Sequence, residues 1–579
     1  MDIRTTGGPA TAEEMKAVDG VLGDPASLWE GGSRHPADDH IAFGGHAARA
    51  QRPLLLPVLH AIQDRIGWVS RGALEYACRR LSIPPAEAYG VVSFYARFAL
   101  EERPALALHI CDDIACKCAG ADELCSALEK SVGPAGKVWH RSPCLGLCDR
   151  APAALVERAG ADHDERQVAP ITIDAAEAVL RGDAWPESKP LAPKGRGSLL
   201  RRVGVVDPDS IDSYREHGGF RALTRAMELG PEGIIRAVTD AKLLGRGGAA
   251  FPTGRKWESV AKAPASPHYL VCNADESEPG TFKDRELMER DPFAVVEAMA
   301  IAAVAAGCEK AFLYVRGEYP LARRRIENAI QKAQASGLLD LEIEVRRGAG
   351  AYICGEETAL FNSIEGKRGE PRNKPPFPVQ AGVFGKPTLV NNVETLVNVL
   401  GILVEGSAAD TRLFCLSGHV REPGLYEVQM GTTLRALIDL AGGVREGRRL
   451  QAVLLGGAAG SFVTEQQLDV PLSFEGTRAI GATLGSGAVI VLDDTADLKQ
   501  IVLRIARFFR DESCGQCVPC RVGTVRQEEV LQRLLTDRRD SDVTLLSDIA
   551  QAMRDASICG LGQTAANAIT SAVIQLKVV

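Results

Sequence analysis

Apolar residues recur with helical spacing in the first ordered part of the chain. Between residues 53 and 98, intervals of three and four residues predict an amphipathic helix, with a stripe made of Leu54, Leu55, Val58, Leu59 and Ile62. We expect a second helix over 74–81 and a third after the proline pair at 84–85, because proline suits a first helical turn. Residues 1–45 lack strong periodicity, so we expect an N-terminal arm that is loose or held by a partner.

From about residue 105 short apolar runs of strand length alternate with helical segments. We expect a strand over 105–110 that leads into Cys111, a helix near 121–131, and a short strand before Cys144. This alternation predicts a compact sheet-and-helix module with ligands on its loops. Together with the preceding helices it forms a predicted unit over 46–180.

The remaining two thirds of the chain divide by pattern into a linker and three further units. Residues 181–204 are rich in proline, glycine and lysine, which is typical of a linker. An α/β domain is expected over 205–408, with strands at 268–272, 310–315 and 341–346. Residues 409–495 predict a small α+β module with a helix over 433–440, and residues 496–579 read as helical throughout. The predicted fold class is therefore multidomain, α/β and α+β.

Composition narrows the class of protein. With 579 residues the chain is too long for one core, and its net charge of −8 argues against nucleic acid as a partner. No apolar run approaches the roughly 20 residues of a membrane span, and the acidic N-terminus does not resemble a signal peptide. We therefore expect a cytoplasmic protein with no direct membrane insertion, in a reducing compartment where clustered cysteines favour metal ligation over disulfides.

Four cysteines near the C-terminus have the spacing of cluster ligands. Cys514, Cys517 and Cys520 are separated by two residues each, and Cys559 is a fourth candidate much later in the chain. Four thiolates also suit structural zinc, but zinc sites commonly use two separated pairs. A set of three plus one favours a [4Fe–4S] cluster.

A second set of four lies near the N-terminus, where zinc is a more serious alternative. Cys111 and Cys116 form one pair, and Cys144 and Cys148 form another. These spacings are looser than those of zinc ribbons, so a [2Fe–2S] cluster is favoured. Two further cysteines compete as ligands but complete no symmetric spacing, namely Cys118 and Cys125.

A glycine-rich loop over 244–257 lies between the two cysteine sets. Its glycines would let backbone N–H groups approach a phosphate, with added charge from Arg246 and Lys256. It is not a dinucleotide fingerprint, because Ala250 occupies the position of the last glycine. Taken alone, such a loop is a simple turn as often as it is a phosphate-binding site.

Two acidic stretches, 273–280 and 348–358, each follow a predicted strand, where ligand-facing loops of α/β sheets begin. Carboxylates there would accept hydrogen bonds from ribose hydroxyls or a carboxamide. The plainer interpretation of any single glutamate is a favourable charge at a helix N-terminus, at about 0.3–1 kcal/mol.

These motifs in this order resemble one family, the NADH-binding flavoprotein subunit of respiratory complex I and its soluble relatives. Over about 205–579 the resemblance lies in the glycine loop, the Asn-Ala-Asp-Glu-Ser-Glu-Pro-Gly segment from Asn273, the Gly-Ala-Gly-Ala-Tyr-Ile-Cys-Gly-Glu-Glu-Thr segment from Gly348, the Asn391–Thr395 segment and the cysteine triplet. Residues 46–180 resemble the family's separate thioredoxin-like [2Fe–2S] subunit. The resemblance implies a thioredoxin-like ferredoxin domain, an α/β FMN- and NAD-binding domain, a small β-grasp-like (SLBB) domain and a C-terminal helical [4Fe–4S] bundle. Ala250 departs from the family, which usually has glycine there.

Site residues follow from the resemblance motif by motif. It implies that FMN contacts Gly245, Arg246, Gly247, Lys256, Asn273, Asp275, Glu276, Tyr352, Gly355, Glu356, Asn391, Asn392 and Thr395. It implies that NAD(H) uses Gly248, Phe251, Lys256, Glu278, Glu357 and Phe377, with Glu278 and Glu357 as positioning groups. Hydride transfer between nicotinamide and flavin would need no protein acid or base.

Fusion of the two subunits narrows the function that the resemblance implies. Fused forms occur in soluble NAD-linked formate dehydrogenases and in NAD-reducing hydrogenases, and some of the latter have an incomplete N-terminal cysteine set. All four are present here, so the chain is most similar to the β subunit of a formate dehydrogenase. Its expected partner is a catalytic α subunit with further Fe–S clusters and a tungsten or molybdenum pterin. The alternatives are a hydrogenase diaphorase, a complex I subunit and, more remotely, a non-catalytic cluster-binding scaffold.

Overall fold

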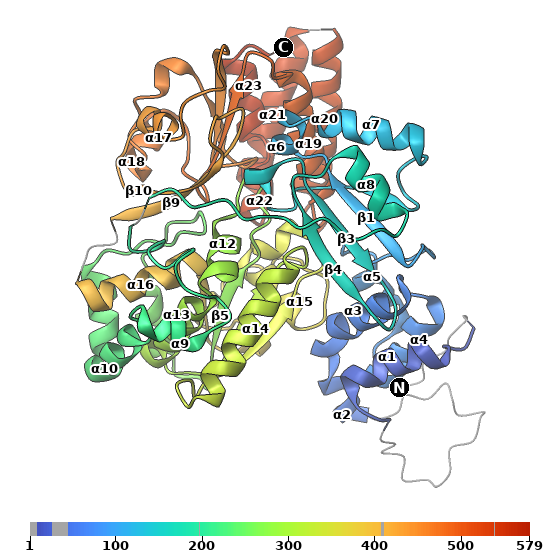
Figure 1. Ribbon diagram of the computed structural model, residues 1–579, viewed down its shortest axis with the longest axis vertical. Coiled ribbons are helices and arrows are strands. Elements are labelled where there is room, and N and C mark those ends of the chain that lie inside the picture. The colour runs from blue at the N-terminus through green and yellow to red at the C-terminus, as the bar shows by residue number, and fades with distance from the viewer. Residues whose placement is uncertain (1–7, 26–44, 196, 407–409, 538, 579) are drawn as a thin grey trace.

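The computed structural model describes residues 8–25, 45–195, 197–406, 410–537 and 539–578 (Figure 1). Its described N-terminal part is helical, and the three expected helices are confirmed as α3, α4 and α5. The elements are α1 (Ala12–Leu22), α2 (Gly45–Ala50), η2 (Arg52–Leu54), α3 (Leu55–Ile66), α4 (Arg71–Leu81) and α5 (Pro85–Val92).

Helix α1 contradicts the expected loose arm over part of its length. Thr11 and Glu14 form a capping box at its start, and Val18 is fully buried against α3 and α4. The Ser70 hydroxyl at the start of α4 donates to Glu14. This contact ties the helix to the body of the protein, because Glu14 serves both the cap and the neighbouring helix. The rest of the expected arm, 1–7 and 26–44, lies outside the described residues.

The next module is a four-stranded sheet in the order β2-β1-β3-β4, in which only β1 and β2 are parallel. Strand β1 leads into Cys111 as expected, and β2 precedes Cys144. The elements are β1 (Leu106–Cys111), α6 (Ile114–Cys118), α7 (Ala121–Ser131), β2 (Trp139–Ser142), η3 (Cys148–Arg150), β3 (Ala154–Arg158), β4 (Asp164–Val168) and α8 (Ile173–Leu180).

The central domain is built on a four-stranded parallel sheet in the order β7-β6-β5-β8. All three expected strands are confirmed, with small differences at their ends. The strands are β5 (His268–Ala274), β6 (Cys308–Val315), β7 (Glu342–Arg347) and β8 (Thr388–Asn392). The helices are α9 (Ile211–Glu216), α10 (Arg221–Asp240), α11 (Thr253–Ala261), α12 (Lys283–Arg290), α13 (Pro292–Ala306), α14 (Pro320–Ala335), η4 (Tyr352–Gly355), α15 (Glu357–Ile364), η5 (Val383–Gly385) and α16 (Val393–Glu405).

Strand order in this sheet creates a crevice. The chain proceeds from β5 outward to β6 and β7, then crosses to the opposite side of β5 to form β8. Loops leaving the carboxyl ends of β5 and β8 therefore diverge, which is where ligands bind in open α/β sheets.

A five-stranded mixed sheet in the order β10-β9-β13-β11-β12 forms the small module. Its expected helix is confirmed as α17. The elements are β9 (Thr411–Gly418), β10 (Gly424–Gln429), α17 (Leu434–Leu440), β11 (Leu450–Leu455), β12 (Ser461–Val463), η6 (Glu465–Gln467), α18 (Phe474–Ala479) and β13 (Ala488–Asp493).

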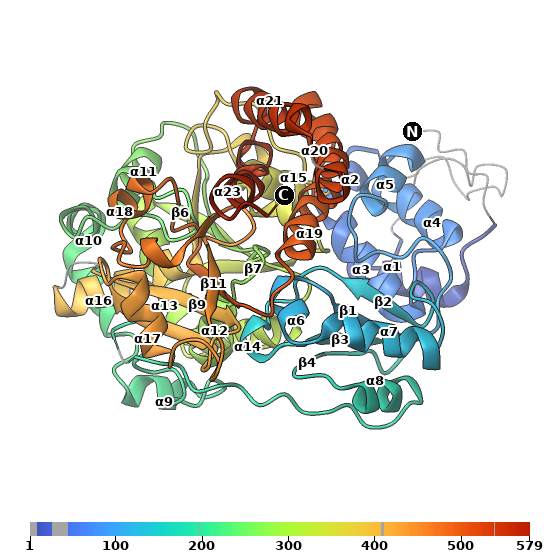
Figure 2. The same cartoon turned by 90° about the horizontal axis from the view of Figure 1, so that it is seen from above.

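The C-terminal part is helical, as expected, and lies against the small sheet and the N-terminal modules (Figures 1 and 2). It comprises α19 (Leu498–Asp511), α20 (Val518–Thr536), α21 (Asp540–Ala556), α22 (Gly560–Thr564) and α23 (Asn567–Gln575). Among the described residues, no helix is both long and apolar enough to cross a membrane.

Ion pairs join the N-terminal modules to the central domain. Arg285 of α12 is fully buried and contacts Asp149 at 3.0 Å, while Arg347 of β7 contacts Asp64 of α3 at 2.9 Å. Because a buried charge such as that of Arg285 is tolerated only when it is paired, these contacts fix the orientation of the modules.

Candidate active site and metal centres

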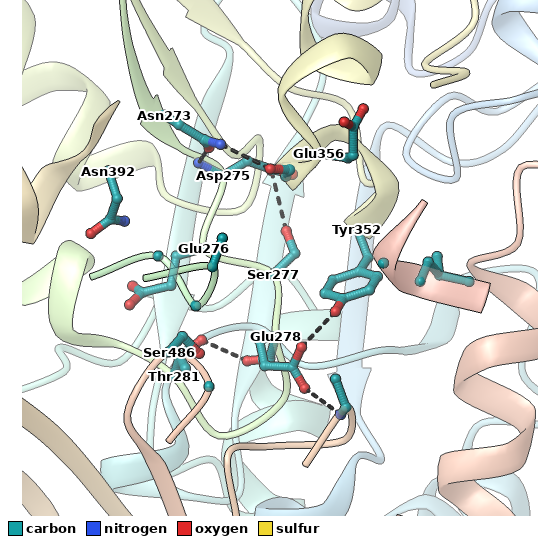
Figure 3. Close-up of a pocket in the computed structure, with 18 of the residues that line it drawn as sticks. Asn273, Asp275, Glu276, Ser277, Glu278, Thr281, Tyr352, Glu356, Asn392 and Ser486 are labelled. Carbon is teal, nitrogen blue, oxygen red and sulfur yellow. Dashed lines mark hydrogen bonds between the residues drawn. The ribbon is translucent and has the colours of Figure 1, made fainter. Parts of the chain in front are cut away.

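A cavity of about 390 Å³ lies beyond the carboxyl ends of β5 and β8, at the crevice between their diverging loops. Its walls come from the central domain, the small sheet module and the C-terminal helices (Figure 3). The lining residues are Gly247, Gly248, Ala249, Asn273, Asp275, Glu276, Ser277, Glu278, Thr281, Asp284, Tyr352, Ile353, Gly355, Glu356, Asn392, Gly456, Ala459, Thr483, Gly485, Ser486, Gly560, Leu561 and Thr564.

The glycine loop forms one wall of this cavity. A side chain at Gly247 would approach the Cβ of Asn392 to 3.2 Å, and Gly248 has a φ of +113° that favours glycine. Ala250 also lies in the left-handed region, with φ 54°. The loop is therefore turned tightly enough to expose backbone toward the cavity, which is the arrangement a phosphate-bearing group requires.

The segment after β5 places three carboxylates around the cavity. Asp275 receives a hydrogen bond from the Ser277 hydroxyl at 3.2 Å through one carboxyl oxygen. Its other oxygen is buried and has no hydrogen-bond partner among the described residues. Burial raises the pKa of Asp275 to about 8. This unpaired oxygen fits a ligand that supplies a hydroxyl or N–H donor, as the ribityl chain of FMN does.

Glu276 is held at the start of α12. Its carboxylate accepts hydrogen bonds from the backbone N–H groups of Asp284 and Arg285, each at 3.0 Å. The Tyr319 hydroxyl adds a third contact at 3.1 Å. Burial, reinforced by the charge of Asp284, raises the pKa of Glu276 to about 7.

Glu278 lies between two modules. It accepts a hydrogen bond from the Tyr352 hydroxyl at 2.6 Å and another from the backbone N–H of Ala459 at 3.0 Å (Figure 3). Burial raises its pKa to about 7. Both carboxyl oxygens therefore have protein partners, so Glu278 fastens the small module to the cavity wall.

The second acidic stretch forms the rim. Glu356 caps α15 by accepting from the N–H groups of Thr358 and Ala359, which is the helix-terminus role that the plainer interpretation gives to such a glutamate. Lys374 contacts Glu356 at 2.9 Å and Glu357 at 3.0 Å. Lys256 also lies 3.7 Å from Glu357 and donates to the Val390 carbonyl at 3.2 Å.

The remaining expected residues do not line the cavity directly. Asn391 accepts from the Trp257 ring N–H at 2.8 Å, and the Thr395 hydroxyl accepts from the Arg246 backbone N–H at 2.8 Å. Arg246 is buried behind the loop, and its guanidinium donates to the Thr411 carbonyl at 3.1 Å. Gly245 pairs through its N–H with Phe251, and Phe251 and Phe377 are 46% and 53% exposed at the rim side.

Sequence reasoning missed the walls contributed by the small module and the last helices. Thr483, Gly485 and Ser486 come from the loop before β13, and Gly560, Leu561 and Thr564 come from α22. Small residues in loops give no signal in the sequence before the modules are packed together. The one clue was the density of glycines at 456–460 and 485–487.

The four N-terminal cysteines converge. The sulfurs of Cys144 and Cys148 are 3.3 Å apart, and the pKa of Cys148 is raised by its hydrogen bond to Cys144, by burial and by the nearby Cys116 and Cys111. The two competitors have other charged groups around them. Besides burial, the pKa of Cys118 responds to Arg445, Asp493 and Cys116, and that of Cys125 responds to Arg141 and Asp112.

The C-terminal cysteines also gather at one place. Cys514 and Cys517 lie in the loop before α20, Cys520 lies in its first turn, and Cys559 precedes α22. Backbone N–H groups of Leu561 and Gly562 donate to the Cys559 sulfur, although burial still raises its pKa to about 12. Such N–H donors suit cluster thiolates. Within the described ranges, no three His, Cys, Asp or Glu side chains close around a single metal ion.

Polar groups connect the cavity to both cysteine sets. Arg316 donates to the Cys144 carbonyl at 2.7 Å and to the Glu276 carbonyl at 2.6 Å. On the other side, the backbone N–H of Tyr352 donates to Glu512 at 2.9 Å, two residues before Cys514. The cavity is thus placed between the two groups of thiols.

Comparison with known proteins decides the family. One of the F-type subunits of the NADH-quinone oxidoreductases of Rhizobium meliloti (strain 1021) is 45% identical over 396 residues, which are 65% of this chain and 94% of that protein. The chain belongs to the family of F-type NADH-quinone oxidoreductase subunits. The F-type protein of Aquifex aeolicus (strain VF5) is also 45% identical, over 64% of this chain and 90% of that protein.

Family models for the parts of the chain agree with this membership. They are a Nuo51 FMN-binding domain over 238–401, an SLBB domain over 413–458, an NADH-ubiquinone oxidoreductase-F iron–sulfur binding region over 500–577 and a thioredoxin-like [2Fe–2S] ferredoxin over 44–176. This member of the F-type family thus contains FMN-binding, [4Fe–4S] and [2Fe–2S] domains in one chain, and the expected fold class is confirmed.

A solved structure shows the same arrangement over nearly the whole length. A chain of an NAD⁺-reducing [NiFe]-hydrogenase in the H₂-reduced state matches with a TM-score of 0.79 and 34% identity, covering 91% of each chain. The HndC protein of the NADP-reducing hydrogenase of Solidesulfovibrio fructosivorans is 41% identical over 64% of this chain and 80% of that protein.

Proposed function

We propose that this chain is the NAD(H)-linked diaphorase subunit of a soluble formate dehydrogenase. In this proposal it transfers electrons between NAD(H) and a catalytic α subunit with a tungsten or molybdenum pterin and further Fe–S clusters. The observation that supports the diaphorase activity most directly is the cavity itself. It joins a glycine loop and an unpaired Asp275 oxygen, and polar contacts connect its walls to the segments that carry the two sets of thiols.

The cavity residues have distinct proposed roles toward FMN. The exposed backbone at Gly247 and Gly248 would face phosphate, with Asn392 across from it. Asp275 and Asn273 would hold the ribityl chain. FMN, when bound, accepts a hydride from NADH and releases the electrons one at a time. The protein's task is to fix the two rings face to face and to keep water out.

Residues that the resemblance gave to FMN but that lie behind the cavity receive an indirect role. Arg246, Asn391 and Thr395 bond to other protein groups, so they would hold the loop and β8 in place. Glu276 does line the cavity, but its carboxylate accepts from the backbone of α12, so it would hold the turn into that helix.

The rim is the proposed NAD(H) site. Phe251 and Phe377 offer exposed aromatic faces for the adenine ring, and Lys256 lies 5.8 Å from the centre of the Phe251 ring. Glu357 would accept hydrogen bonds from ribose hydroxyls. Glu278, whose two oxygens are already bonded within the protein, would instead fix the wall against which the nicotinamide lies.

The thiol sets are the proposed cluster ligands. Cys514, Cys517, Cys520 and Cys559 would hold the [4Fe–4S] cluster, and Cys111, Cys116, Cys144 and Cys148 would hold the [2Fe–2S] cluster. Hydrogen bonds to Cys559 and the mutual proximity of the N-terminal sulfurs support both assignments.

The choice of partner enzyme is argued from the domain organisation of the chain. Fusion of the [2Fe–2S] domain to the F-type flavoprotein, with all four N-terminal cysteines present, supports a formate dehydrogenase. The diaphorase of an NAD⁺-reducing hydrogenase is the second candidate, because the hydrogenase chain matches 91% of this chain, fusion included. A scaffold without nucleotide binding is disfavoured by the intact cavity.

The deciding experiment is purification of the chain from its native host with the proteins that accompany it. NAD⁺ reduction is assayed with formate and with H₂, and the partner is analysed for tungsten, molybdenum and nickel. Formate activity with tungsten or molybdenum supports the proposal. Activity with H₂ and nickel would assign the chain to a hydrogenase instead. Absence of FMN and of NADH-dependent ferricyanide reduction would overturn the diaphorase function itself.

A further inference from the structure

A second cavity, also of about 390 Å³, lies on the side of the N-terminal cysteines away from the candidate active site. It is lined by Cys148 and Asp149, by residues of α6 and by the small module. Cys144, in contrast, lines a smaller cavity of about 110 Å³ together with Ser277 and Tyr352 of the active-site wall. The N-terminal cysteine set therefore has one side toward the active site and one toward this outer cavity.

Arginines surround the outer cavity. Arg421 and Arg445 line it, and both are exposed. Arg448 and Arg449 follow on the same short loop and are also exposed, Arg449 to 89% of its side chain. We call these four residues the arginine rim. The acidic groups at the cavity are Glu446, which is exposed, and Asp149, which is buried and already paired with Arg285.

The arginine rim is held in shape by its backbone. Gly442, Gly443 and Gly447 all have φ near +75°, which folds the loop after α17 back on itself. The backbone N–H of Arg421 donates to the Gly443 carbonyl at 2.9 Å, and that of Arg445 donates to the His419 carbonyl at 3.2 Å. A charged loop that is fixed before binding loses little entropy when a partner docks.

Hydrogen bonds connect the small module next to the rim with the [2Fe–2S] domain. His419 of the small module bonds through one ring nitrogen to the Cys118 carbonyl at 3.2 Å and contacts Asp493 at 2.8 Å through the other. Burial, together with the charges of Arg445 and Arg448, lowers the pKa of His419 despite the opposing carboxylate of Asp493. Arg449 is paired with Asp494 at 3.4 Å and Glu446 lies among the arginines, so the four arginines leave an excess of positive charge here in a chain whose net charge is −8.

We propose that the arginine rim is a docking surface for a small acidic one-electron carrier protein of the ferredoxin class. Charge complementarity between arginines and an acidic carrier would steer the encounter, as in weak electron-transfer complexes. The outer cavity is lined by Cys148, so the redox group of a carrier bound at the arginine rim would approach the [2Fe–2S] domain from outside. This inference rests on the proposed ligand role of Cys148 but adds a partner different from the α subunit.

The exchange balances without a further reactant. Two reduced carriers give one electron each, and with one proton these electrons convert NAD⁺ into NADH. Plant-type ferredoxins are low-potential carriers, which makes them reductants in this direction.

The test uses the full chain loaded with its cofactors and a plant-type [2Fe–2S] ferredoxin as the probe. Binding of oxidised ferredoxin is measured by titration at low and high ionic strength, and NAD⁺ reduction is measured with photoreduced ferredoxin. The double variant Arg421→Glu, Arg445→Glu is compared with Arg225→Glu, an exposed arginine of α10 in a distant part of the molecule (Figure 1). If charge reversal impairs folding, the double variant Arg421→Gln, Arg445→Gln is used instead, because it removes the two charges without reversing them.

We expect the double reversal to weaken ferredoxin binding and ferredoxin-dependent NAD⁺ reduction by at least about tenfold at low salt, with the Arg225→Glu variant unchanged. Raising the ionic strength should abolish most of the difference. NADH–ferricyanide activity should remain intact in every variant, which separates failure of docking from failure of the proposed function. Absence of binding to the wild-type chain, or equal rates in the rim variants and the control, would overturn the proposal.

Discussion

The Tyr352 hydroxyl donates a 2.6 Å hydrogen bond to the Glu278 carboxylate across the candidate active site. Tyr352 follows β7, and its backbone N–H donates to Glu512 at the end of α19. Its ring also packs against Phe508 of α19, with ring centres 5.0 Å apart. Glu278 in turn accepts from Ala459 of the small module. This pair therefore joins three modules at the wall of one cavity.

Replacing Tyr352 by phenylalanine tests this junction. The ring would keep its contact with Phe508, but Glu278 would lose a hydrogen bond that lowers its pKa. We expect the pH dependence of NADH–ferricyanide activity to shift upward by about one unit. Tyr89→Phe, at an exposed tyrosine, is the control. An unchanged pH profile would show that the bond does not set the charge of Glu278.

The raised pKa of Glu278, about 7, predicts a pH-dependent stability. A carboxyl group whose pKa is higher in the folded state contributes stability below its unfolded pKa and loses it as pH rises through the folded value. The wild-type protein should therefore lose on the order of 3 kcal/mol from this group between about pH 5 and pH 8. Glu278→Gln should lack that loss.

The measurement is the difference in unfolding midpoint between Glu278→Gln and wild type, without cofactors, at both pH values. Other buried carboxyls such as Asp275 titrate in both proteins and cancel in the difference. We expect the variant to gain relative stability at pH 8. An equal difference at both pH values would contradict the assigned direction.

Ala250 is an L-residue in the left-handed region, at a position where the family resemblance suggests glycine. For an L-residue that conformation costs roughly 1–2 kcal/mol of stability. A glycine avoids this cost but lowers stability by about 0.4–1 kcal/mol, because its unfolded chain has more conformational freedom to lose. We expect Ala250→Gly to raise stability by no more than about 1.6 kcal/mol, the largest difference between these two effects, and to leave FMN affinity unaltered. Ala250→Val should weaken FMN binding by at least about tenfold, because a β-branched residue is a conformational outlier there. The FMN affinities of both variants are measured from the quenching of FMN fluorescence on titration. Equal affinities of Ala250→Val and wild type would contradict the interpretation that the loop is strained at this position.

Serine substitutions distinguish the N-terminal ligands from their competitors. Cys118→Ser and Cys125→Ser should retain the [2Fe–2S] signal in electron paramagnetic resonance spectra of the reduced protein. Cys148→Ser should lose it, together with about two iron atoms per chain. If Cys148→Ser kept the [2Fe–2S] signal and Cys118→Ser lost it, the ligand would be Cys118 rather than Cys148.

Arg285 is expected to be essential for seating the [2Fe–2S] domain. Its fully buried guanidinium contacts Asp149 and donates to the Gly146 carbonyl at 2.9 Å. Arg285→Met would leave Asp149 with Arg150 as its remaining partner, at 3.0 Å, so we expect a cost of up to about 3–5 kcal/mol. Thermal unfolding and proteolysis within 181–204 should both reveal the loosened domain. Arg225→Met, at an exposed arginine of α10, should change neither.

Local pattern was sufficient for most elements of this fold. Apolar runs located β5 and β6 to within two residues, because buried parallel strands are continuous in hydrophobicity, and the partly exposed edge strand β7 was located to within one residue. Helix α1 was missed although its capping box, Thr11 to Glu14, is present in the sequence. The domain boundaries and the site roles remain predictions.

The sequence by itself determined the chemistry available to this protein, since two sets of four thiols, a glycine loop and acidic segments are properties of residue type and spacing. Only the tertiary structure decided which of those groups face one another. It turned Cys118 toward the small module, bonded both oxygens of Glu278 within the protein, and left one Asp275 oxygen unpaired in the cavity. The physical reason is that hydrogen bonding and burial at this site depend on three modules packed together, and no local pattern encodes contacts between residues hundreds of positions apart.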